Sequence, residues 1–272
     1  MLFRSMLRGD YMKILIAGYG FVGREISKLF GDANVYDPKL YCTDHDGEWN
    51  EILQASYDFC FVCVPTPSKE DGSCDTSIVE DVVNRIDADI FIIRSTIPPG
   101  TTEKLGKNCV FTPEYVASSS PYPAPLGDIK KRDFHILGGE KEATKKVRKL
   151  FETVYPPTVT FMETDSLTAE IIKYGENFYI STKVTFCNEF YKICQKFGVD
   201  YDTFREGVFK LDPRMTEWWT YCEGKGWGGH CLPKDTMAIV KCCEDAGYDP
   251  KFLKAVIENN ERHKSTNGRI SI

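Results

Sequence analysis

Short runs of apolar residues, each bounded by turn-forming residues, recur along the first half of the chain. Near-continuous apolar strands are typical of a parallel sheet that is covered on both faces. Segments with apolar residues at helical spacing lie between these runs, and this alternation predicts a doubly wound α/β fold. The expected strands are Lys13–Ala17, Asn34–Tyr36, Phe59–Val64, Ile90–Arg94, Cys109–Phe111, Phe134–Leu137 and Thr158–Phe161. The expected helices among them are Phe21–Phe30, Thr76–Ile86, Thr102–Leu105 and Lys141–Val154.

The pattern changes near residue 164. From Thr164 to about Phe197 the chain has no proline and a single glycine, and apolar residues recur at helical spacing. We predict one long helix there, with Thr164 or Asp165 as its N-cap. We therefore predict a mainly parallel α/β domain over residues 12–163, followed by an all-α domain over residues 164–272 that begins with the long helix. The shorter helices expected in the second domain are Asp202–Phe209, Met237–Ala246 and Phe252–His263.

Composition and charge exclude several classes of protein. Of the 272 residues, 42% are hydrophobic and 27% are charged, as in an ordinary soluble globular protein. With 34 basic and 40 acidic side chains the net charge is −6, which disfavours nucleic acid or a membrane surface as partner. No apolar run approaches the roughly 20 residues of a membrane span, and the first eleven residues lack the apolar core of a secretory signal. We expect a cytoplasmic protein.

The eleven cysteines are accordingly expected to be free thiols, nucleophiles or metal ligands rather than disulfides. Cys60 and Cys63 point to opposite faces of a strand, and Cys242–Cys243 has no companion pair at zinc-ligand spacing. No metal site is expected.

The loop after the first expected strand has the pattern GxGxxG. Gly18 would permit a tight turn, Gly20 a close approach by a pyrophosphate, and Gly23 close packing of the helix on the strand. Asp37 ends the next strand 19 residues after Gly18, where an acid can bind a ribose and repel a 2′-phosphate. This favours NAD over NADP and predicts a Rossmann-like domain; the alternative is a glycine-rich turn that binds nothing. The cofactor residues expected in the loop are Gly18, Tyr19, Gly20, Phe21, Val22 and Gly23.

Three further strands end in loops that are rich in proline and hydroxyl groups. Pro65 and Thr66 follow the third strand, Ser95 and Thr96 follow the fourth, and Glu114 follows the fifth. Ligands of open α/β sheets bind beyond the carboxyl ends of the strands, so these loops are expected to meet at one crevice. The alternative is that proline and threonine simply end these strands.

Candidate chemistry also lies in the helical half. Lys173 and Asn177 are four residues apart and share one helix face, where a cation and an amide can stabilise a developing negative oxygen. A solvated helix face is the alternative. Further on, a loop with four glycines in six positions (224–229) precedes Cys231, and a lysine and an aspartate follow the cysteine. A thiol beside a cation can have a lowered pKa and act as a nucleophile, whereas an inert buried thiol is the alternative.

Together these motifs resemble the UDP-glucose/GDP-mannose (nucleotide-sugar) 6-dehydrogenase family. The resemblance covers about residues 12–262 and follows the order of the family's motifs. Besides GYGFVG, it rests on VPTP with DGSCD, STIPPGTT, TPE, AEIIKYGENFYISTKVTFCNE, the triplet Asp212-Pro-Arg214 and GGHCLPKD. It implies a four-electron oxidation that uses two NAD: a C6 alcohol becomes an aldehyde, a thiol captures it, and the thiohemiacetal is oxidised to a thioester that water hydrolyses.

The resemblance assigns roles to individual residues. Cys231 would be the nucleophile, Lys173 and Asn177 would stabilise oxyanions, and Asp235 would work with Lys173 and an ordered water as acid and base. Thr96 would place water and cofactor. The other implied cofactor contacts are Pro65, Thr66, Ser95 and Lys234, and the other implied substrate contacts are Glu114, Tyr115, Gly228 and Arg214.

Two of these assignments carry a further consequence. Glu114 would assist hydride transfer or thioester hydrolysis. Arg214 would reach into the neighbouring subunit's substrate site, which implies a homodimer formed through the helical domain. The implied substrate is a small nucleotide sugar.

The sequence departs from the family at two points. Ser118 stands where a second glutamate is often found, so substrate contacts or the hydrolysis step are expected to differ. The family usually carries a third, nucleotide-binding domain, whereas this chain stops soon after the helix Phe252–His263. We expect that domain to be supplied by a separate chain, to be unnecessary, or to have been lost.

Two other functions stay open. A dehydrogenase of the 3-hydroxyacid/6-phosphogluconate type also has a long helix with Lys and Asn, but it removes one hydride and needs no thiol. A catalytically silent dinucleotide-binding relative is the second. Because Cys231, Lys173, Asn177 and Asp235 are all present, the nucleotide-sugar dehydrogenase is the preferred interpretation. The identity of the sugar and of the nucleotide is left open.

Overall fold

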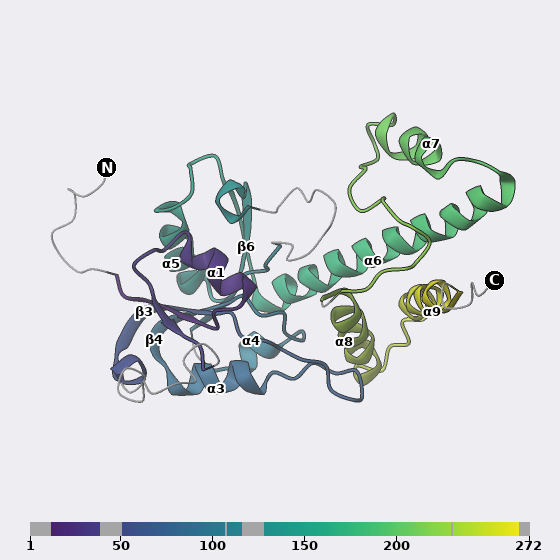
Figure 1. Cartoon of the computed structure of the whole chain (residues 1–272). Helices are drawn as coiled ribbons and strands as arrows, with labels where there is room; N and C mark the ends of the chain where they lie inside the picture. Colours follow the sequence, from purple (N-terminus) through teal and green to yellow (C-terminus); the bar gives the residue numbers. More distant parts are fainter. Residues whose placement is uncertain (1–11, 39–50, 107, 116–127, 230, 267–272) are drawn as a thin grey trace.

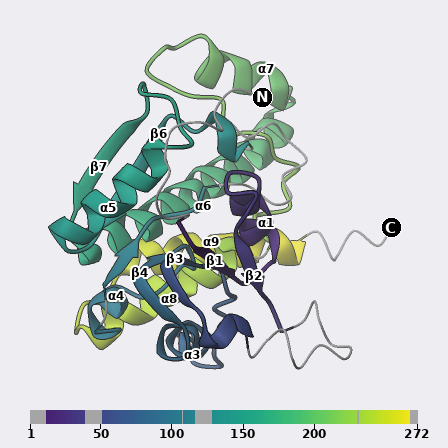
Figure 2. The ribbon, with the colours of Figure 1, turned by 90° about the vertical axis from the view of Figure 1, so that its left-hand side faces the viewer.

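Seven strands form a single sheet in this computed structural model, which describes residues 12–38, 51–106, 108–115, 128–229 and 231–266. The strand order is β2-β1-β3-β4-β5-β6-β7, and every neighbouring pair is parallel except β5 with β6. Figure 2 shows β1 to β4, β6 and β7 of this sheet. The predicted Rossmann-like, mainly parallel sheet is therefore confirmed. The strands are β1 (Ile14–Ala17), β2 (Asn34–Tyr36), β3 (Ser56–Val62), β4 (Asp87–Ile93), β5 (Cys109–Phe111), β6 (Phe134–Gly138) and β7 (Thr160–Thr164).

Helices cover both faces of the sheet. Alternate strand residues point to opposite faces, so Phe61 joins one hydrophobic cluster and its neighbour Val62 joins the other. The first cluster includes residues of α1 (Phe21–Ser27) and α5 (Lys141–Glu152), and the second includes residues of α3 (Ser77–Arg85). Burial on both faces explains why the central strands, such as β1 and β5, are apolar.

The long helix α6 (Ser166–Phe197) follows the last strand directly. Asp165 is its N-cap, as predicted, because its Oδ1 accepts a hydrogen bond from the Thr168 backbone nitrogen at 2.8 Å. Gly198 ends the helix with a left-handed φ of 69°. Figure 1 shows that α6 runs from the sheet to the small helix α7 (Tyr201–Arg205), so it connects the α/β part with the helical part.

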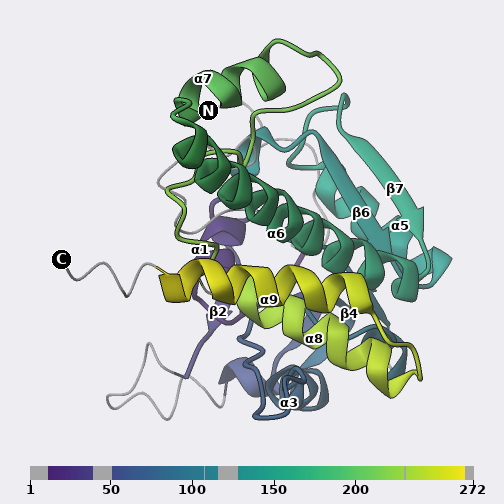
Figure 3. The same cartoon turned by 90° about the vertical axis from the view of Figure 1, so that its right-hand side faces the viewer.

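The remaining elements are helical, and none of the described residues after Thr164 lies in a strand. They are the π-helical turn η2 (Glu206–Lys210), α8 (Cys231–Asp245) and α9 (Lys251–Thr266); α8 and α9 pack on α6 (Figure 3). The sequence analysis placed the start of α8 at Met237, which is wrong by six residues. Pro233 fits inside the first turn because backbone nitrogens there have no partner within the helix.

No helix in the described part of the chain combines the length and the apolar character that crossing a lipid bilayer requires. The proline-rich segment after Tyr115, including Ser118, lies outside the described residues, as does His230.

Candidate active site

The glycine loop after β1 has the geometry that a dinucleotide loop needs. Gly18 has a φ of 90°, and a Cβ there would lie 2.7 Å from the Cys63 carbonyl oxygen. A Cβ at Gly23 would lie 2.0 Å from the Gly18 carbonyl oxygen, so both positions require glycine. A Cβ at Gly20 would meet no atom within 4 Å, which leaves the loop open to a ligand at that residue.

Asp37 lies beside this loop. It follows β2, and its Oδ2 accepts a hydrogen bond from the Tyr19 backbone nitrogen at 2.7 Å. The carboxylate therefore borders the open space at Gly20, where a ribose hydroxyl could reach it. An accessible loop backbone next to an acid fits an NAD molecule, and this donor and acceptor set supports the predicted cofactor.

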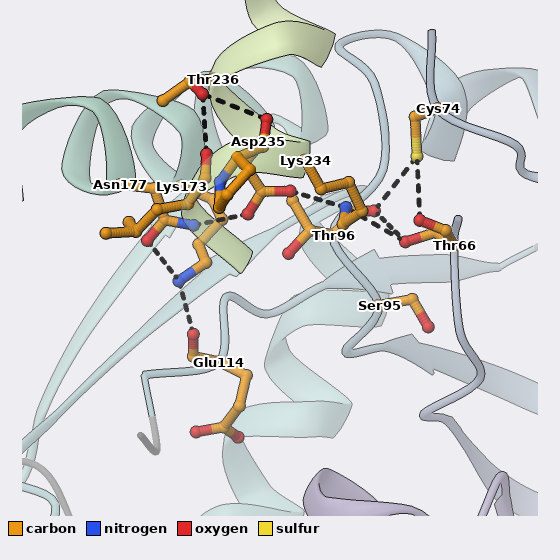
Figure 4. Close-up of polar contacts among 12 residues, drawn as sticks. Thr66, Cys74, Ser95, Thr96, Glu114, Lys173, Asn177, Lys234, Asp235 and Thr236 are labelled. Atoms are coloured by element: carbon orange, nitrogen blue, oxygen red, sulfur yellow. Dashed lines mark hydrogen bonds and ion pairs between the residues drawn. The ribbon is translucent and has the colours of Figure 1, made fainter. Parts of the chain in front are cut away.

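The loops after β3 and β4 are tied together at the same edge of the sheet (Figure 4). The Thr66 hydroxyl donates to the Thr96 carbonyl oxygen at 2.8 Å, and the Ser95 hydroxyl donates to the Val64 carbonyl oxygen at 2.6 Å. The buried thiol of Cys74 lies 3.8 Å and 3.7 Å from the carbonyl oxygens of Thr66 and Thr96. The predicted meeting of these loops is thus present in the structure.

A polar network joins α6 to α8 and to these loops (Figure 4). The Asn177 amide nitrogen donates to the Asp235 Oδ2 at 2.6 Å, and its Oδ1 accepts from the Lys173 Nζ at 3.3 Å. The Lys234 Nζ lies 2.6 Å from the Asp235 Oδ1 and 3.4 Å from the Thr66 hydroxyl. Lys173, Asn177 and Asp235 are buried, so the solvated-face alternative is wrong.

The carboxylate of Glu114 does not lie beside Lys173, where the role implied by the family resemblance requires it. Lys173 donates to its backbone carbonyl oxygen at 2.6 Å, while its carboxylate points away from the network (Figure 4). That carboxylate forms ion pairs with Arg94 and, at 2.7 Å, with Arg132, and it also accepts from the Tyr115 backbone nitrogen. Because two buried guanidinium groups hold it, the carboxylate of Glu114 does not reach the Lys173–Asp235 network in this structure.

Burial changes the pKa of the lysine in this network. Loss of solvation lowers the pKa of Lys173, although the carboxylates of Asp235, Glu176 and Glu114 and the Cys231 thiol act in the opposite direction. A lysine of this kind gives up its proton more readily than an exposed one. It can therefore act as a base as well as an oxyanion donor.

Cys231 begins α8 and is exposed. It precedes Asp235 by four residues, so the two side chains share one face of the helix. Desolvation by its neighbours and the negative charge of Asp235 raise the pKa of the Cys231 thiol, whereas Lys173 and Lys234 lower it. The expected lowering of this pKa is therefore wrong for the free protein, because desolvation, which is the largest cause, and the charge of Asp235 together outweigh the two cations.

This shift predicts how Cys231 reacts with iodoacetamide. Only the thiolate is alkylated, and the usual pKa of a thiol is about 8.5. The alkylation rate of Cys231, followed by mass spectrometry of its peptide, should keep rising as the pH increases beyond that value. A rate that levels off below about pH 8 would contradict the raised pKa.

The glycine loop before Cys231 is anchored on α6 and α9. Asn260 is fully buried; its Oδ1 accepts from the Trp227 backbone nitrogen at 2.6 Å, and its Nδ2 donates to the Trp227 carbonyl oxygen at 3.0 Å. The Asn188 Oδ1 accepts from the Gly226 nitrogen at 3.1 Å. A Cβ at Gly226 would lie 2.6 Å from the Asn260 Oδ1, so glycine is required by close approach. The loop that delivers the cysteine is thereby held rigidly.

Asn260→Ala should destabilise the protein. The change leaves both polar backbone groups of Trp227 buried without a partner, which costs about 2–3 kcal/mol. We expect the melting temperature to fall by roughly 5–10 °C, measured by circular dichroism. Asn259→Ala is the matched control, since in the described part of the chain the Asn259 amide donates to the Ala255 carbonyl oxygen of its own helix and to no other group. Equal melting temperatures for the two variants would contradict the anchoring role.

Comparison with known proteins shows the family. Residues 48–159 match the sequence model of the NAD binding domain of the UDP-glucose/GDP-mannose dehydrogenase family. Residues 167–262 match the model of the central domain of the same family. The chain belongs to the UDP-glucose/GDP-mannose dehydrogenase family. The matched NAD-binding domain implies NAD as the cofactor.

Individual relatives agree with this assignment. A UDP-glucose 6-dehydrogenase of Rickettsia felis is 31% identical over 231 residues, which are 79% of this chain and 50% of the relative. One of Haloferax volcanii is 28% identical over 310 residues, covering 92% of this chain and 70% of that protein. The chain spans about half the length of several of the curated relatives it matches.

Solved structures of family members share the fold. A UDP-glucose dehydrogenase from Pyrobaculum islandicum aligns with a TM-score of 0.77 and 24% identity over 95% of this chain and 70% of that chain. A UDP-D-ManNAc dehydrogenase from Pyrococcus horikoshii aligns with a TM-score of 0.73 and 25% identity over 93% of this chain and 69% of that chain. Their names include different sugars, so the fold by itself does not select one.

Two residues expected at the family's substrate site lie apart from the network. Arg214 is exposed, with its guanidinium 2.6 Å from the Asp212 Oδ2, and Gly228 is exposed in the loop before α8. Neither contacts Lys173, Asn177 or Asp235 in the hydrogen bonds of the described residues.

Several residues of the site escaped the sequence analysis. Arg94 was treated as part of a strand. A charged residue at the end of a buried apolar run is itself a signal, because a buried charge needs a partner of opposite charge. Asn188 and Asn260 are polar residues on otherwise apolar helix faces, which is a similar signal. Cys74 lies within the DGSCD motif, which supported the family resemblance without assigning a place to the thiol. For Arg132 we find no sequence feature that would have indicated its place.

Proposed function

We propose that this protein is an NAD-dependent nucleotide-sugar 6-dehydrogenase that oxidises the C6 hydroxyl of a UDP-glucose-like sugar to the acid. The observation that carries the proposal is the buried Lys173–Asn177–Asp235 network, with the exposed Cys231 thiol one helical turn from Asp235. A thiol allows one site to remove two hydrides without releasing an aldehyde.

The donors that remain available support oxyanion stabilisation. An ammonium group has three N–H bonds, and Lys173 uses two of them, on Glu114 and Asn177. The Asn177 amide nitrogen has two N–H bonds and uses one, on Asp235. Among the described residues, each side chain therefore has one N–H without a hydrogen-bond acceptor, available for a substrate oxygen that becomes negative. The Lys173 Nζ also lies 4.9 Å from the centre of the Tyr115 ring.

The reaction then proceeds in four steps. Asp235 takes up the proton of the C6 hydroxyl as the alcohol is oxidised to the aldehyde. The Cys231 thiolate attacks the aldehyde carbon, a C–S bond forms, and the carbonyl oxygen becomes the negative oxygen that Lys173 and Asn177 bind. Oxidation of this thiohemiacetal yields the thioester. Water attacks the thioester, the C–S bond breaks, and the carboxylate and the free thiolate are released.

NAD supplies the hydride acceptor for both oxidations when it is bound. Thr96 places water and cofactor, and Asp235 moves the protons, because the carboxylate of Glu114 is engaged with two arginines. The overall balance is one alcohol, one water and two NAD⁺ giving one carboxylate, two NADH and three protons. The residues proposed to hold NAD are Gly18, Tyr19, Gly20, Phe21, Val22, Gly23, Asp37, Pro65, Thr66, Ser95, Thr96 and Lys234.

The proposal includes a homodimer formed through the helical part, with Arg214 and Gly228 at the substrate site and Arg214 serving the neighbouring subunit. Large apolar side chains are exposed along α6, which supports a further packing partner there. An apolar groove of about 740 Å³ lies among α6, α8 and α9. The exposed apolar residues of α6 are Leu167, Ile171, Tyr179, Phe186, Ile193 and Phe197.

Counting NADH per sugar tests the function. The purified chain is mixed with single UDP- and GDP-sugars and NAD, and NADH and sugar acid are measured together. Two NADH per sugar, with acid as product, is the expected result. One NADH per substrate would support a single-hydride dehydrogenase instead, and NAD binding without turnover of any sugar would support a silent dinucleotide-binding protein.

A further inference from the structure

Glu170 is a completely buried acid on α6 that the proposed chemistry does not use. Its carboxylate accepts three hydrogen bonds from the segment after β4: from the Gly100 nitrogen at 2.5 Å, and from the Thr102 nitrogen and hydroxyl at 2.8 Å and 2.6 Å. Thr102 belongs to the short helix α4 (Thr101–Lys104). All three contacts cross from the helical part of the chain to the α/β part.

The position of Glu170 on α6 relates it to the network. Lys173 and Asn177 follow it by three and seven residues, so the three side chains lie on one face of the helix. The segment that Glu170 binds is the end of the loop that contains Ser95 and Thr96. The same acid is therefore linked to the proposed oxyanion donors through the helix and to the proposed cofactor loop through hydrogen bonds.

These contacts complete a closed chain of interactions. From Thr96 the contacts pass to Thr66, to Lys234, to Asp235 and back to α6 at Asn177. Glu170 connects the other end of the β4–α4 loop to the same helix. Two attachments of one loop to one rigid helix restrict its movement far more than a single attachment.

We propose that Glu170 is a positioning residue that holds α6 against the β4–α4 loop and so sets Lys173 at its working distance from Thr96; the inference rests on the proposed dehydrogenase activity. Its carboxylate has acceptor capacity for all three donors. The other acids of α6 have different partners: Glu176 interacts with Tyr115 of the loop after β5, and Glu189 pairs with Arg262.

Glu170→Gln tests the proposal because it keeps the size of the side chain and removes one acceptor oxygen. An NH₂ group would then face backbone N–H donors. We expect kcat to fall about 10- to 100-fold, since small displacements of reacting groups have effects of this order. The dissociation constant for NAD, measured by calorimetry, should change by a smaller factor than kcat does, because most of the residues proposed to hold NAD, such as Gly20 and Asp37, belong to other loops. Values of kcat are expressed per NAD-binding site, so that unfolded protein does not contribute.

Two further variants sharpen the test. Thr102→Val removes only the hydroxyl donor and should reduce kcat less than Glu170→Gln does. Glu189→Gln is the matched control on the same helix, since Glu189 is about half exposed and pairs with Arg262 at 3.1 Å. Wild-type kcat in Glu170→Gln, or an equal loss in Glu189→Gln, would overturn the proposal.

Amide hydrogen exchange separates this inference from the function on which it rests. Exchange at Gly100 and Thr102 should become faster in Glu170→Gln and stay unchanged in Glu189→Gln, whether or not a sugar is turned over. If the wild-type chain oxidises no sugar, the proposed function fails, and unchanged exchange at these two amides would overturn the attachment itself. Faster exchange with wild-type kcat would show that the attachment does not position the site.

Discussion

Cys231→Ser should abolish formation of the sugar acid. The serine hydroxyl is a far weaker nucleophile than a thiolate, so the aldehyde is not captured and no thioester forms. We expect acid production to fall by at least about 1,000-fold, as is usual when a covalent nucleophile is lost. The measurement is the yield of sugar acid by mass spectrometry after prolonged incubation with NAD.

A second cysteine of α8 provides the control for this prediction. Cys243 is partly buried, lines the apolar groove and lies outside the polar network. Cys243→Ser makes the same chemical change on the same helix and should leave the acid yield close to that of the wild type. An acid yield in Cys231→Ser that equals the wild-type value would refute the covalent route.

Lys173→Ala should reduce kcat by about 100- to 1,000-fold, which is the usual effect of removing one donor to a developing oxyanion. The substitution also leaves the Glu114 carbonyl oxygen and the Asn177 Oδ1 without their shared donor. The apparent KM for NAD should change little, because Lys173 contacts none of the loop residues proposed to hold the cofactor. Initial rates at saturating sugar and NAD measure both quantities.

Lys196→Ala is the control for that substitution, since Lys196 is an exposed lysine in the last turn of the same helix. It should retain wild-type kcat. A loss of less than about tenfold in Lys173→Ala would mean that another group carries the negative oxygen, and the assignment of Lys173 would be abandoned.

The carboxylates of Asp235 and Glu114 lie near Lys173 but have different partners, and we expect their roles to differ for that reason. Asp235 is buried and contacts the Asn177 amide and the Lys234 ammonium, beside the proposed oxyanion donors, so it lies where it could exchange a proton with a bound substrate. Glu114 is held by Arg94 and Arg132, and only its backbone oxygen faces Lys173. We therefore assign proton transfer to Asp235, although the family resemblance had implied a part for both.

Much of the fold follows from local patterns. Apolar runs predicted the central strands β1, β3, β4 and β5 to within a few residues, because strands buried on both faces are apolar over most of their length. The spacing of Lys173 and Asn177 placed them on one helix face, because an α-helix repeats every 3.6 residues. Gly18 and Gly23 were recognised from the GxGxxG pattern after the first strand, and the structure shows that neither position has room for a Cβ.

By itself, the sequence determined the order of strands and helices, the face of α6 that carries Lys173 and Asn177, and the glycine positions of the first loop. Only the tertiary structure decided which way Glu114 turns, what raises the pKa of Cys231, and which residues Asn260 and Glu170 hold. The reason is physical. Periodicity and backbone sterics act within a few residues of one another, whereas a hydrogen bond or an ion pair depends on partners that folding brings together from distant parts of the chain.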